Sequence, residues 1–180
     1  MKKDIIYLTG FMGSGKSTIG PILANTIGYD FVDVDKTIET TANKTIMEIF
    51  SNNGEGYFRE LERKVVQEIS GTHGSVISLG GGTVTKKENL AVIKSTGVLV
   101  YLKADPGEIF HRLKFKADRP LLKSNGGTTL DDGELLQQIM RLIEEREPFY
   151  TQADIVVNTG GKKIGHTVDE IVRRIRTLIE

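Results

Sequence analysis

The sequence predicts an α/β protein built around a parallel sheet. Short apolar, β-branched runs alternate along the chain with longer segments of helical period, an order typical of sheets whose strands are connected by helices. Several of these runs lack polar alternation, as expected of strands that are covered on both faces. The 180 residues suffice for one domain with a proper core and are few for two, so we expect a single domain over residues 1–180.

Five apolar runs are predicted as strands because each is too short for a helix. In chain order they are Asp4–Thr9, Phe31–Val34, Val76–Leu79, Val98–Leu102 and Ile155–Val157. Segments of helical period lie among them, at Lys16–Ile27, Ile46–Phe50, Glu55–Ile69, Lys86–Lys94, Gly107–Phe115 and Leu130–Glu147. The pattern therefore predicts a five-stranded parallel sheet flanked by helices.

A last helix is predicted near the C-terminus, where Thr167 and Glu170 have the spacing of a capping box. An apolar stripe follows, made of Val168, Ile171, Val172, Ile175, Leu178 and Ile179. Arg173, Arg174 and Arg176 lie between these positions. We interpret the arginines as the solvated face of a packed helix rather than as a basic binding patch.

The segment Gly10–Ser17 reads GFMGSGKS and fills the phosphate-binding loop pattern GxxxxGK[ST] directly after the first predicted strand. A glycine-rich turn between a strand and a helix aims backbone N–H groups and the positive helix end at one point, which suits a chain of phosphates. In this interpretation Lys16 reaches the β- and γ-phosphates and Ser17 contacts Mg²⁺. The alternative is a plain glycine-rich turn whose Lys and Ser face water.

The composition excludes several other functions. Lys plus Arg and Asp plus Glu both number 24, so no net positive field favours nucleic acid or an anionic membrane as a partner. The absence of Cys excludes disulfides, thiol catalysis and cysteine-ligated zinc, and the three His residues lack metal-ligand spacing. No apolar run approaches the ~18 residues that span a bilayer. We expect a cytoplasmic protein.

Two segments depart from the alternation of strands and helices. We interpret residues of about 33–62 as an insertion over the sheet. The second segment is Ala117–Thr129, which reads ADRPLLKSNGGTT and is rich in residues that stop a helix. Its length is unusual for a passive connection, so we predict a mobile lid over about 114–129.

Asp33 and Asp35 end the second predicted strand as Asp-Val-Asp. Ligands of open parallel sheets lie outside the carboxyl ends of the strands, and side chains two apart on a strand share a face. One carboxylate is then suited to hold the Mg²⁺ shell, and the other to grip or deprotonate an acceptor hydroxyl. The alternative is that these residues cap the following turn or helix.

Further candidates are less specific by themselves. Gly80, Gly81 and Gly82 allow either close approach of a ligand or a turn with positive φ. Arg59 is followed at helical spacing by Glu62, which suits either a grip on a carboxylate or a surface ion pair. Arg119 in the predicted lid is placed to neutralise a transferring phosphate. Arg146 near Pro148 either binds an anion or complements the end of a helix.

Together these segments resemble the shikimate kinases over essentially the whole chain. Six blocks carry the resemblance in the family's order: GFMGSGKSTIG at 10–20, FVDVDKTIE at 31–39, IMEIFSNNGEGYFRELE at 46–62, SLGGG at 78–82, RPLL at 119–122 and EREPFY at 145–150. The resemblance implies a three-layer P-loop kinase fold of the nucleoside-monophosphate-kinase type. It also implies ATP-dependent phosphorylation of the 3-hydroxyl of shikimate, in aromatic amino acid biosynthesis by way of chorismate.

The resemblance also implies the roles of individual residues. ATP would contact Gly13, Ser14, Gly15, Lys16, Ser17, Thr18, Arg112 and Arg119, with adenine near Arg112 and residues 158–163, and Mg²⁺ would be held by Ser17 and Asp33. Shikimate would be bound by Asp35, Arg59, Gly80, Gly81, Gly82 and Arg146, between Phe50 and Phe58, with Glu62 orienting Arg59. Lys16, Asp35 and Arg119 would be catalytic. We expect ATP and shikimate as partners of a monomer.

Other functions remain to be weighed against this one. A kinase of gluconate or of a nucleoside monophosphate shares the architecture but gives no obvious reason for Asp35, Arg59 and Arg146 together. A GTPase-type switch needs the motif Asn-Lys-x-Asp, whereas Asn43 and Lys44 are followed by Thr45 and Ile46. The balanced charge disfavours a nucleic-acid-binding module.

Overall fold

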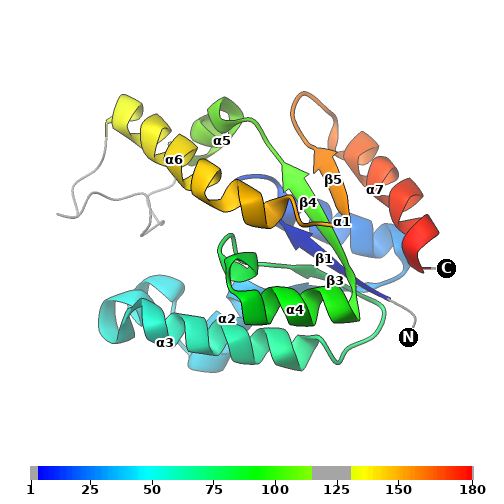
Figure 1. Ribbon diagram of the computed structural model, residues 1–180, viewed down its shortest axis with the longest axis horizontal. Coiled ribbons are helices and arrows are strands. Elements are labelled where there is room, and N and C mark those ends of the chain that lie inside the picture. The colour runs from blue at the N-terminus through cyan, green and yellow to red at the C-terminus, as the bar shows by residue number, and fades with distance from the viewer. Residues whose placement is uncertain (1–3, 115–130, 180) are drawn as a thin grey trace.

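The computed structural model describes residues 4–114 and 131–179 and shows a five-stranded sheet in which every neighbouring pair of strands is parallel. The strand order is β2-β3-β1-β4-β5 (Figure 1). The strands are β1 (Ile5–Thr9), β2 (Asp30–Asp33), β3 (Ser75–Ser78), β4 (Val98–Lys103) and β5 (Ile155–Asn158). The first strand is therefore central, and the chain leaves its carboxyl end into the glycine-rich loop.

Helices cover both faces of the sheet, which confirms the three-layer α/β fold. They are α1 (Lys16–Ile27), α2 (Val34–Ala42), α3 (Ile46–Ile69), α4 (Lys87–Thr96), α5 (Pro106–Leu113), α6 (Asp132–Tyr150) and α7 (Ile164–Ile179), with a short 3₁₀ turn η1 (Thr83–Thr85). Helices α1 and α7 pack on one face, and the other described helices contribute to the core on the opposite face (Figure 1). No helix within the described ranges has the length and apolar character needed to cross a membrane.

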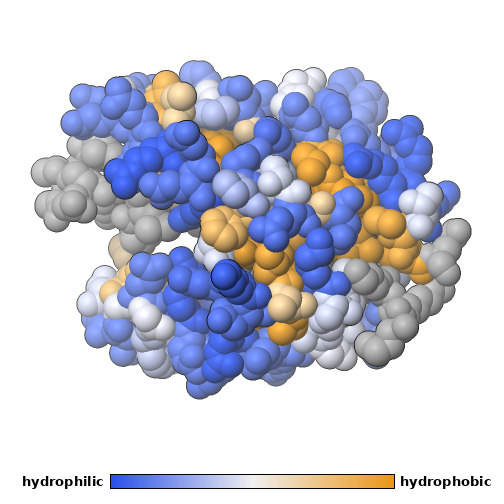
Figure 2. Space-filling model, viewed as in Figure 1, coloured by the Kyte–Doolittle hydropathy of each residue, from blue (hydrophilic) through white to orange (hydrophobic). Residues whose placement is uncertain are grey.

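The central strand β1 supplies both cores because its side chains alternate between the two faces. Ile5 and Tyr7 belong to the core under α3, α4 and α6, whereas Ile6 and Leu8 belong to the core under α1 and α7. All four side chains are almost completely buried. This double burial explains why the strand reads as one unbroken apolar run. On the surface shown in Figure 2, hydrophilic residues cover α3 and α6, and hydrophobic residues gather in a band between them.

Helix α3 contains a break that the sequence partly anticipates. Gly54 has a φ of 80° and a ψ of 171°, values outside the helical region, so the helix consists of two pieces. These pieces correspond to the predicted helical segments 46–50 and 55–69. A capping box between Thr45 and Glu48 begins the first piece, because each side chain accepts a hydrogen bond from the other residue's backbone N–H. The second piece carries Phe58, Arg59 and Glu62, which line the smaller cavity described below.

Several sequence predictions are corrected by the structure. Helix α2 was not predicted, and it places Asp35 on a helix instead of a strand. Helix α7 begins at Ile164, so Thr167 lies inside it and the capping box predicted with Glu170 is wrong. Glu170 instead pairs with Lys162 at 2.8 Å. Leu178 is exposed, although the predicted stripe included it. The predicted lid segment 117–129 lies outside the described residues.

Candidate active site

The phosphate-loop glycines are required by backbone geometry. Gly10, Gly13 and Gly15 have φ values of 143°, 81° and 104°, which side chains with a Cβ rarely adopt. A Cβ on Gly10 would also lie 2.6 Å from the carbonyl oxygen of Leu102. The loop ends at the first turn of α1, where the N–H groups of Thr18 and Ile19 both donate to the carbonyl of Gly15. The backbone thus forms the turn that the sequence motif predicts.

Lys16 follows this loop as the first residue of α1 and is 9% exposed. Its Nζ donates to the carbonyl oxygens of Gly10 at 2.8 Å and Phe11 at 3.1 Å. The ammonium group is therefore held across the loop by two backbone carbonyls. This position brings a positive charge to the rim of the adjoining cavity.

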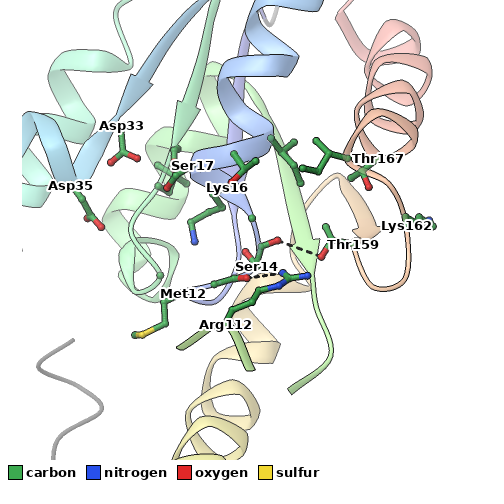
Figure 3. Close-up of a pocket in the computed structure, with 18 residues that line it drawn as sticks. Met12, Ser14, Lys16, Ser17, Asp33, Asp35, Arg112, Thr159, Lys162 and Thr167 are labelled. Atoms are coloured by element: carbon green, nitrogen blue, oxygen red, sulfur yellow. Dashed lines mark hydrogen bonds between the residues drawn. The ribbon is translucent and has the colours of Figure 1, made fainter. Parts of the chain in front are cut away.

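A cavity of about 500 Å³ opens over the loop, a volume typical of small-molecule sites (Figure 3). Its lining includes residues 13–18, all of which the sequence predicts as nucleotide contacts, together with Asp33, Asp35 and Arg112. Thr159 and Lys162 line it as well, which agrees with the predicted border at residues 158–163. The cavity thus collects the predicted nucleotide and metal residues that lie within the described ranges.

Asp33 and Asp35 reach this cavity by a different route from the predicted one. Asp33 ends β2, and its side chain accepts a hydrogen bond of 3.3 Å from the backbone N–H of Lys36 as the N-cap of α2. Asp35 lies in the first turn of α2. The two carboxylates therefore do not share a strand face, yet Figure 3 shows both beside Lys16 and Ser17. The alternative interpretation, in which the aspartate caps a helix, is therefore correct for Asp33. The cap uses one carboxylate oxygen, and the other can contact the ligand shell of a metal ion.

Arg112 connects the phosphate loop with the β5–α7 connection. Its Nη1 donates to the carbonyl oxygen of Gly13 at 2.8 Å, and its Nη2 pairs with Glu108 at 3.1 Å. Glu108 also accepts a hydrogen bond of 3.1 Å from the backbone N–H of Gly161. Arg112 is therefore positioned on the wall of the larger cavity.

A second, smaller cavity of about 80 Å³ adjoins the first. Its lining combines two arginines, two phenylalanines, two acids and three glycines: Arg59, Arg146, Phe50, Phe58, Asp35, Glu62, Gly80, Gly81 and Gly82, with Met12 and Ile46. The ring centroids of Phe50 and Phe58 are 4.8 Å apart, and the two rings form one apolar wall. Met12, Asp35 and Gly81 line both cavities. The structure thus brings all the residues predicted for the second substrate together beside the larger cavity.

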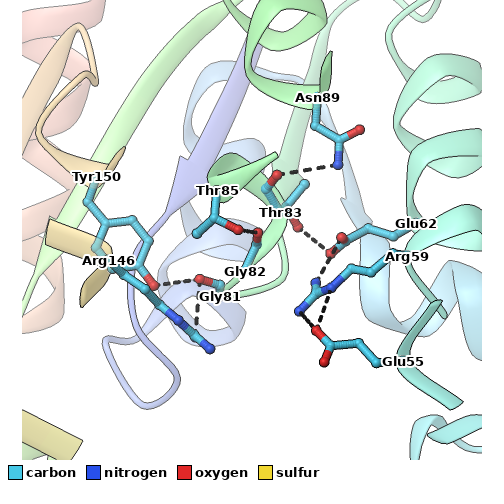
Figure 4. Close-up of polar contacts among 10 residues, drawn as sticks. All are labelled: Glu55, Arg59, Glu62, Gly81, Gly82, Thr83, Thr85, Asn89, Arg146 and Tyr150. Atoms are coloured by element: carbon cyan, nitrogen blue, oxygen red, sulfur yellow. Dashed lines mark hydrogen bonds and ion pairs between the residues drawn. The ribbon is translucent and has the colours of Figure 1, made fainter. Parts of the chain in front are cut away.

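Arg59 is held by carboxylates on both sides (Figure 4). Its Nε and Nη2 donate to Glu55 at 3.1 and 3.0 Å, and its Nη1 donates to Glu62 at 3.0 Å. Burial by itself would lower the pKa of Arg59, but the charges of and hydrogen bonds to Glu62 and Glu55 outweigh burial and raise it. The guanidinium is therefore a fixed cation at the cavity wall, and not a surface ion pair, because the Glu62 side chain is 1% exposed.

The run of three glycines lies close to neighbouring side chains, and these distances show where a side chain has no room. Gly80, Gly81 and Gly82 all have φ values outside the positive region, so a positive-φ turn is the wrong interpretation. A Cβ on Gly80 would lie 3.0 Å from Asp35 and 3.1 Å from Glu62. A Cβ on Gly82 would lie 2.9 Å from Nη2 of Arg59, and one on Gly81 would lie 3.4 Å from Arg146. Gly80 and Gly82 thus make room for charged side chains, whereas a Cβ on Gly81 would make only an ordinary contact.

Arg146 projects from α6, which continues through Pro148 to Tyr150 rather than ending near Arg146. Its Nη1 lies 3.4 Å from the carbonyl oxygen of Gly81, and its guanidinium lies 5.6 Å from the ring centre of Phe11. The same carbonyl accepts a hydrogen bond of 2.5 Å from Tyr150 Oη, whose pKa burial raises to about 12. Tyr150 and Glu55 were not predicted as site residues. Arg119, predicted as catalytic, lies outside the described residues.

The arrangement provides two adjoining compartments with different chemistry. One has an anion-binding loop, a lysine and oxygen ligands for a hard cation. The other has two arginines, which suit a carboxylate, and an apolar wall. Asp35 lies where the compartments meet. Such a site can transfer a phosphoryl group between a nucleotide and a small anionic acceptor.

Comparison with known proteins gives the family. A family model described as shikimate kinase matches residues 12–176. The shikimate kinase of Prosthecochloris aestuarii is 50% identical to this chain over 176 residues, covering 98% of this chain and 89% of the relative. The shikimate kinase of Chlorobium phaeobacteroides strain DSM 266 is 47% identical and covers 98% of this chain and 93% of the relative.

Solved structures agree with these relatives. The shikimate kinase from Acinetobacter baumannii in complex with shikimate superposes with a TM-score of 0.88 at 31% identity, covering 97% of this chain and 93% of the other. The shikimate kinase from Bacteroides thetaiotaomicron gives a TM-score of 0.87 at 36% identity, covering 96% and 98%. With the phosphate loop, the paired arginines and the adjoining cavities in place, this chain belongs to the shikimate kinase family.

Proposed function

We propose that this chain transfers the γ-phosphoryl group of ATP to the 3-hydroxyl of shikimate, giving shikimate 3-phosphate and ADP in aromatic amino acid biosynthesis. The observation that carries the proposal is the shared wall of the two cavities, in which Asp35 faces both the phosphate-loop side and the arginine side. A hydroxyl held beside Asp35 is then directed at the end of a triphosphate bound along the loop. Family membership supports the assignment of the two cavities to ATP and shikimate.

The nucleotide is proposed to lie along the larger cavity. The loop backbone and the N-terminus of α1 would surround its phosphates, and Lys16 would exchange its loop carbonyls for phosphate oxygens. Arg112, Thr159 and Lys162 would border the adenine end. Arg119 is proposed to add a further positive charge to the phosphates.

The residues around the loop fit a magnesium ion that accompanies ATP. The Ser17 hydroxyl and the Asp33 carboxylate line the same cavity, and hard oxygen ligands are those that Mg²⁺ prefers. The described residues hold no cluster of three or more acidic, His or Cys ligands, which suits an ion completed by phosphate and water oxygens. When bound, the ion would neutralise charge on the phosphates.

Shikimate is proposed to fill the smaller cavity. Arg59 and Arg146 would bind its carboxylate, Phe50 and Phe58 would contact the ring, and Asp35 would accept a hydrogen bond from a ring hydroxyl. Asp35 is also the candidate general base. Because phosphoryl transfer needs little covalent help from the protein, we expect positioning and charge neutralisation by Lys16, Mg²⁺ and Arg119 to dominate catalysis.

The proposed function is tested by ADP release with shikimate, gluconate and a nucleoside monophosphate as acceptors. We expect kcat/KM for shikimate to exceed that for gluconate by a factor of about 10² or more, because the apolar phenylalanine wall suits a ring better than an open polyhydroxy chain. Faster turnover of gluconate or of the monophosphate would contradict the assignment. Dependence of ADP release on added Mg²⁺ tests the cation in the same assay.

Gly82→Ala tests whether the missing side chain at position 82 leaves room for the Arg59 guanidinium. The added Cβ would lie 2.9 to 3.3 Å from the guanidinium, so the guanidinium must shift while the backbone keeps an ordinary φ. We expect KM for shikimate to rise about tenfold with little change in the melting temperature. Gly56→Ala is the matched control, because a Cβ there meets nothing within 4 Å. An unchanged KM in Gly82→Ala would contradict the spatial explanation.

Three further expectations remain proposals. A kinase that draws on the cellular ATP pool is expected in the cytoplasm. The chain is expected to act as a monomer. Its balanced charge gives no electrostatic reason for a nucleic-acid partner.

A further inference from the structure

The buried carboxylate of Glu62 connects Arg59 to the 3₁₀ turn that follows the glycines. One oxygen, Oε2, accepts the bond of 3.0 Å from Nη1 of Arg59. The other oxygen, Oε1, accepts a bond of 2.7 Å from the hydroxyl of Thr83 (Figure 4). Both Glu62 and Thr83 are 0% exposed. Water therefore does not compete for either oxygen, and the orientation of the carboxylate depends on these two donors.

Thr83 is itself fixed by its surroundings. Its backbone N–H donates to the carbonyl oxygen of Gly80 at 3.1 Å, and its carbonyl oxygen accepts a bond of 3.3 Å from the side chain of Asn89 in α4. Asn89 is 2% exposed. The hydroxyl therefore reaches Glu62 from a rigid turn that is anchored to another helix. A chain of buried hydrogen bonds runs from α4 through η1 and α3 to the guanidinium at the cavity wall.

The Thr83 hydroxyl supplies a donor that Glu62 needs. An ionised carboxylate is acceptor-only, and a buried acceptor without a donor is costly. The position of a Cβ on Gly80 would be 3.1 Å from both Glu62 Oε1 and Thr83 Oγ1 and 3.0 Å from Asp35 Oδ1. Two carboxylate oxygens therefore approach the same small space. A donor directed at Oε1 stabilises the negative charge of Glu62 beside Asp35 and keeps the carboxylate turned toward Arg59.

We infer that Thr83 is a positioning residue for acid-substrate binding, acting on Arg59 through its hydrogen bond to Glu62. The inference rests on the proposed function, since the anion that Arg59 binds is taken to be the shikimate carboxylate. Thr83 does not line either cavity and does not contact the substrate in this account. Its effect is therefore confined to the orientation of the guanidinium.

The test compares Thr83→Val with Thr83→Ser. Valine keeps the branched shape but removes the hydroxyl, and serine restores it. We expect Thr83→Val to raise KM for shikimate about tenfold with KM for ATP changed less than about twofold. Thr83→Ser should return KM for shikimate to within about threefold of the wild-type value. Thermal unfolding of each variant, measured alongside, separates binding from folding.

Thr85→Val is the matched control, because Thr85 lies in the same 3₁₀ turn and its hydroxyl donates to the carbonyl of Gly82 at 2.7 Å instead of to Glu62. We expect it to leave KM for shikimate within about twofold of wild type. Equal changes in both KM values for Thr83→Val, no rescue by Thr83→Ser, or the same shift in Thr85→Val would overturn the inference. Wild-type turnover of shikimate, measured first, tests the proposed function independently.

Discussion

Lys16→Met is expected to abolish phosphoryl transfer while the fold persists. The Lys16 ammonium is held 2.8 Å from the Gly10 carbonyl at the rim of the larger cavity. Methionine fills a similar volume but supplies no charge for the β- and γ-phosphates. Because fixed charge dominates phosphoryl transfer, we expect kcat to fall by a factor of about 10³ or more, measured as ADP release at saturating shikimate.

Lys64→Met provides the matched control for this substitution. The Lys64 side chain is 64% exposed and lies 3.8 Å from Glu60, a weak surface pair. We expect its kcat to remain at the wild-type level. Circular dichroism of Lys16→Met should retain the α/β spectrum, although two loop carbonyls lose their donor. Turnover near the wild-type rate in Lys16→Met would show that the loop does not bind the transferred phosphate.

The fold was predictable because its signals are local. Residues of β1 and β4 are buried on both faces, and this alone makes them unbroken apolar runs that cannot be read as amphipathic helices. The phosphate loop needs positive φ at fixed positions, so its glycines are visible in the sequence. Both features depend on near neighbours in the chain, which is the information that a pattern contains.

The errors occurred at the ends of helices and strands, where more than one nearby residue can form the terminus. Thr167 and Glu170 have the spacing of a cap, but Glu170 pairs with Lys162 and α7 begins one turn earlier, at Ile164. The second strand ends at Asp33 because that residue caps α2, and this moves Asp35 from strand to helix. Pro148 does not end α6, which continues to Tyr150. Sequence spacing cannot distinguish between these competing partners.

The site was predicted to different depths for different residues. The family resemblance assigned Arg59, Arg146 and the glycines to one substrate site. The residue types alone left each of them with a purely structural alternative. Tyr150 donates to the Gly81 carbonyl, 69 residues away in the sequence. Thr83 donates to the Glu62 carboxylate, 21 residues away. Nothing near either residue in the sequence indicates those partners. Only the folded chain shows that the glycine segment is held from two sides.

Arg59→Ala is expected to weaken binding of the acid substrate by about 2 to 3 kcal/mol, or roughly 30- to 150-fold in dissociation constant. Alanine removes the fixed cation opposite the substrate carboxylate. It leaves the ATP cavity intact, since Arg59 lines only the smaller cavity. Isothermal titration with shikimate and, separately, with ADP and Mg²⁺ measures both affinities. Arg63→Ala is the control, because Arg63 lies one turn further along α3, is 41% exposed and pairs with Glu60.

Arg59→Lys separates the loss of charge from the loss of geometry. Alanine leaves the Glu62 carboxylate buried without its cation, which can lower stability as well as affinity. Lysine keeps a positive charge beside Glu62 but lacks the planar fork that contacts Glu55, Glu62 and a ligand together. We therefore expect Arg59→Lys to fold like the wild type and still bind shikimate about tenfold more weakly. Equal loss of shikimate and nucleotide affinity in these variants would contradict the role of Arg59, because a guanidinium that serves only the acid cannot change binding in the other cavity.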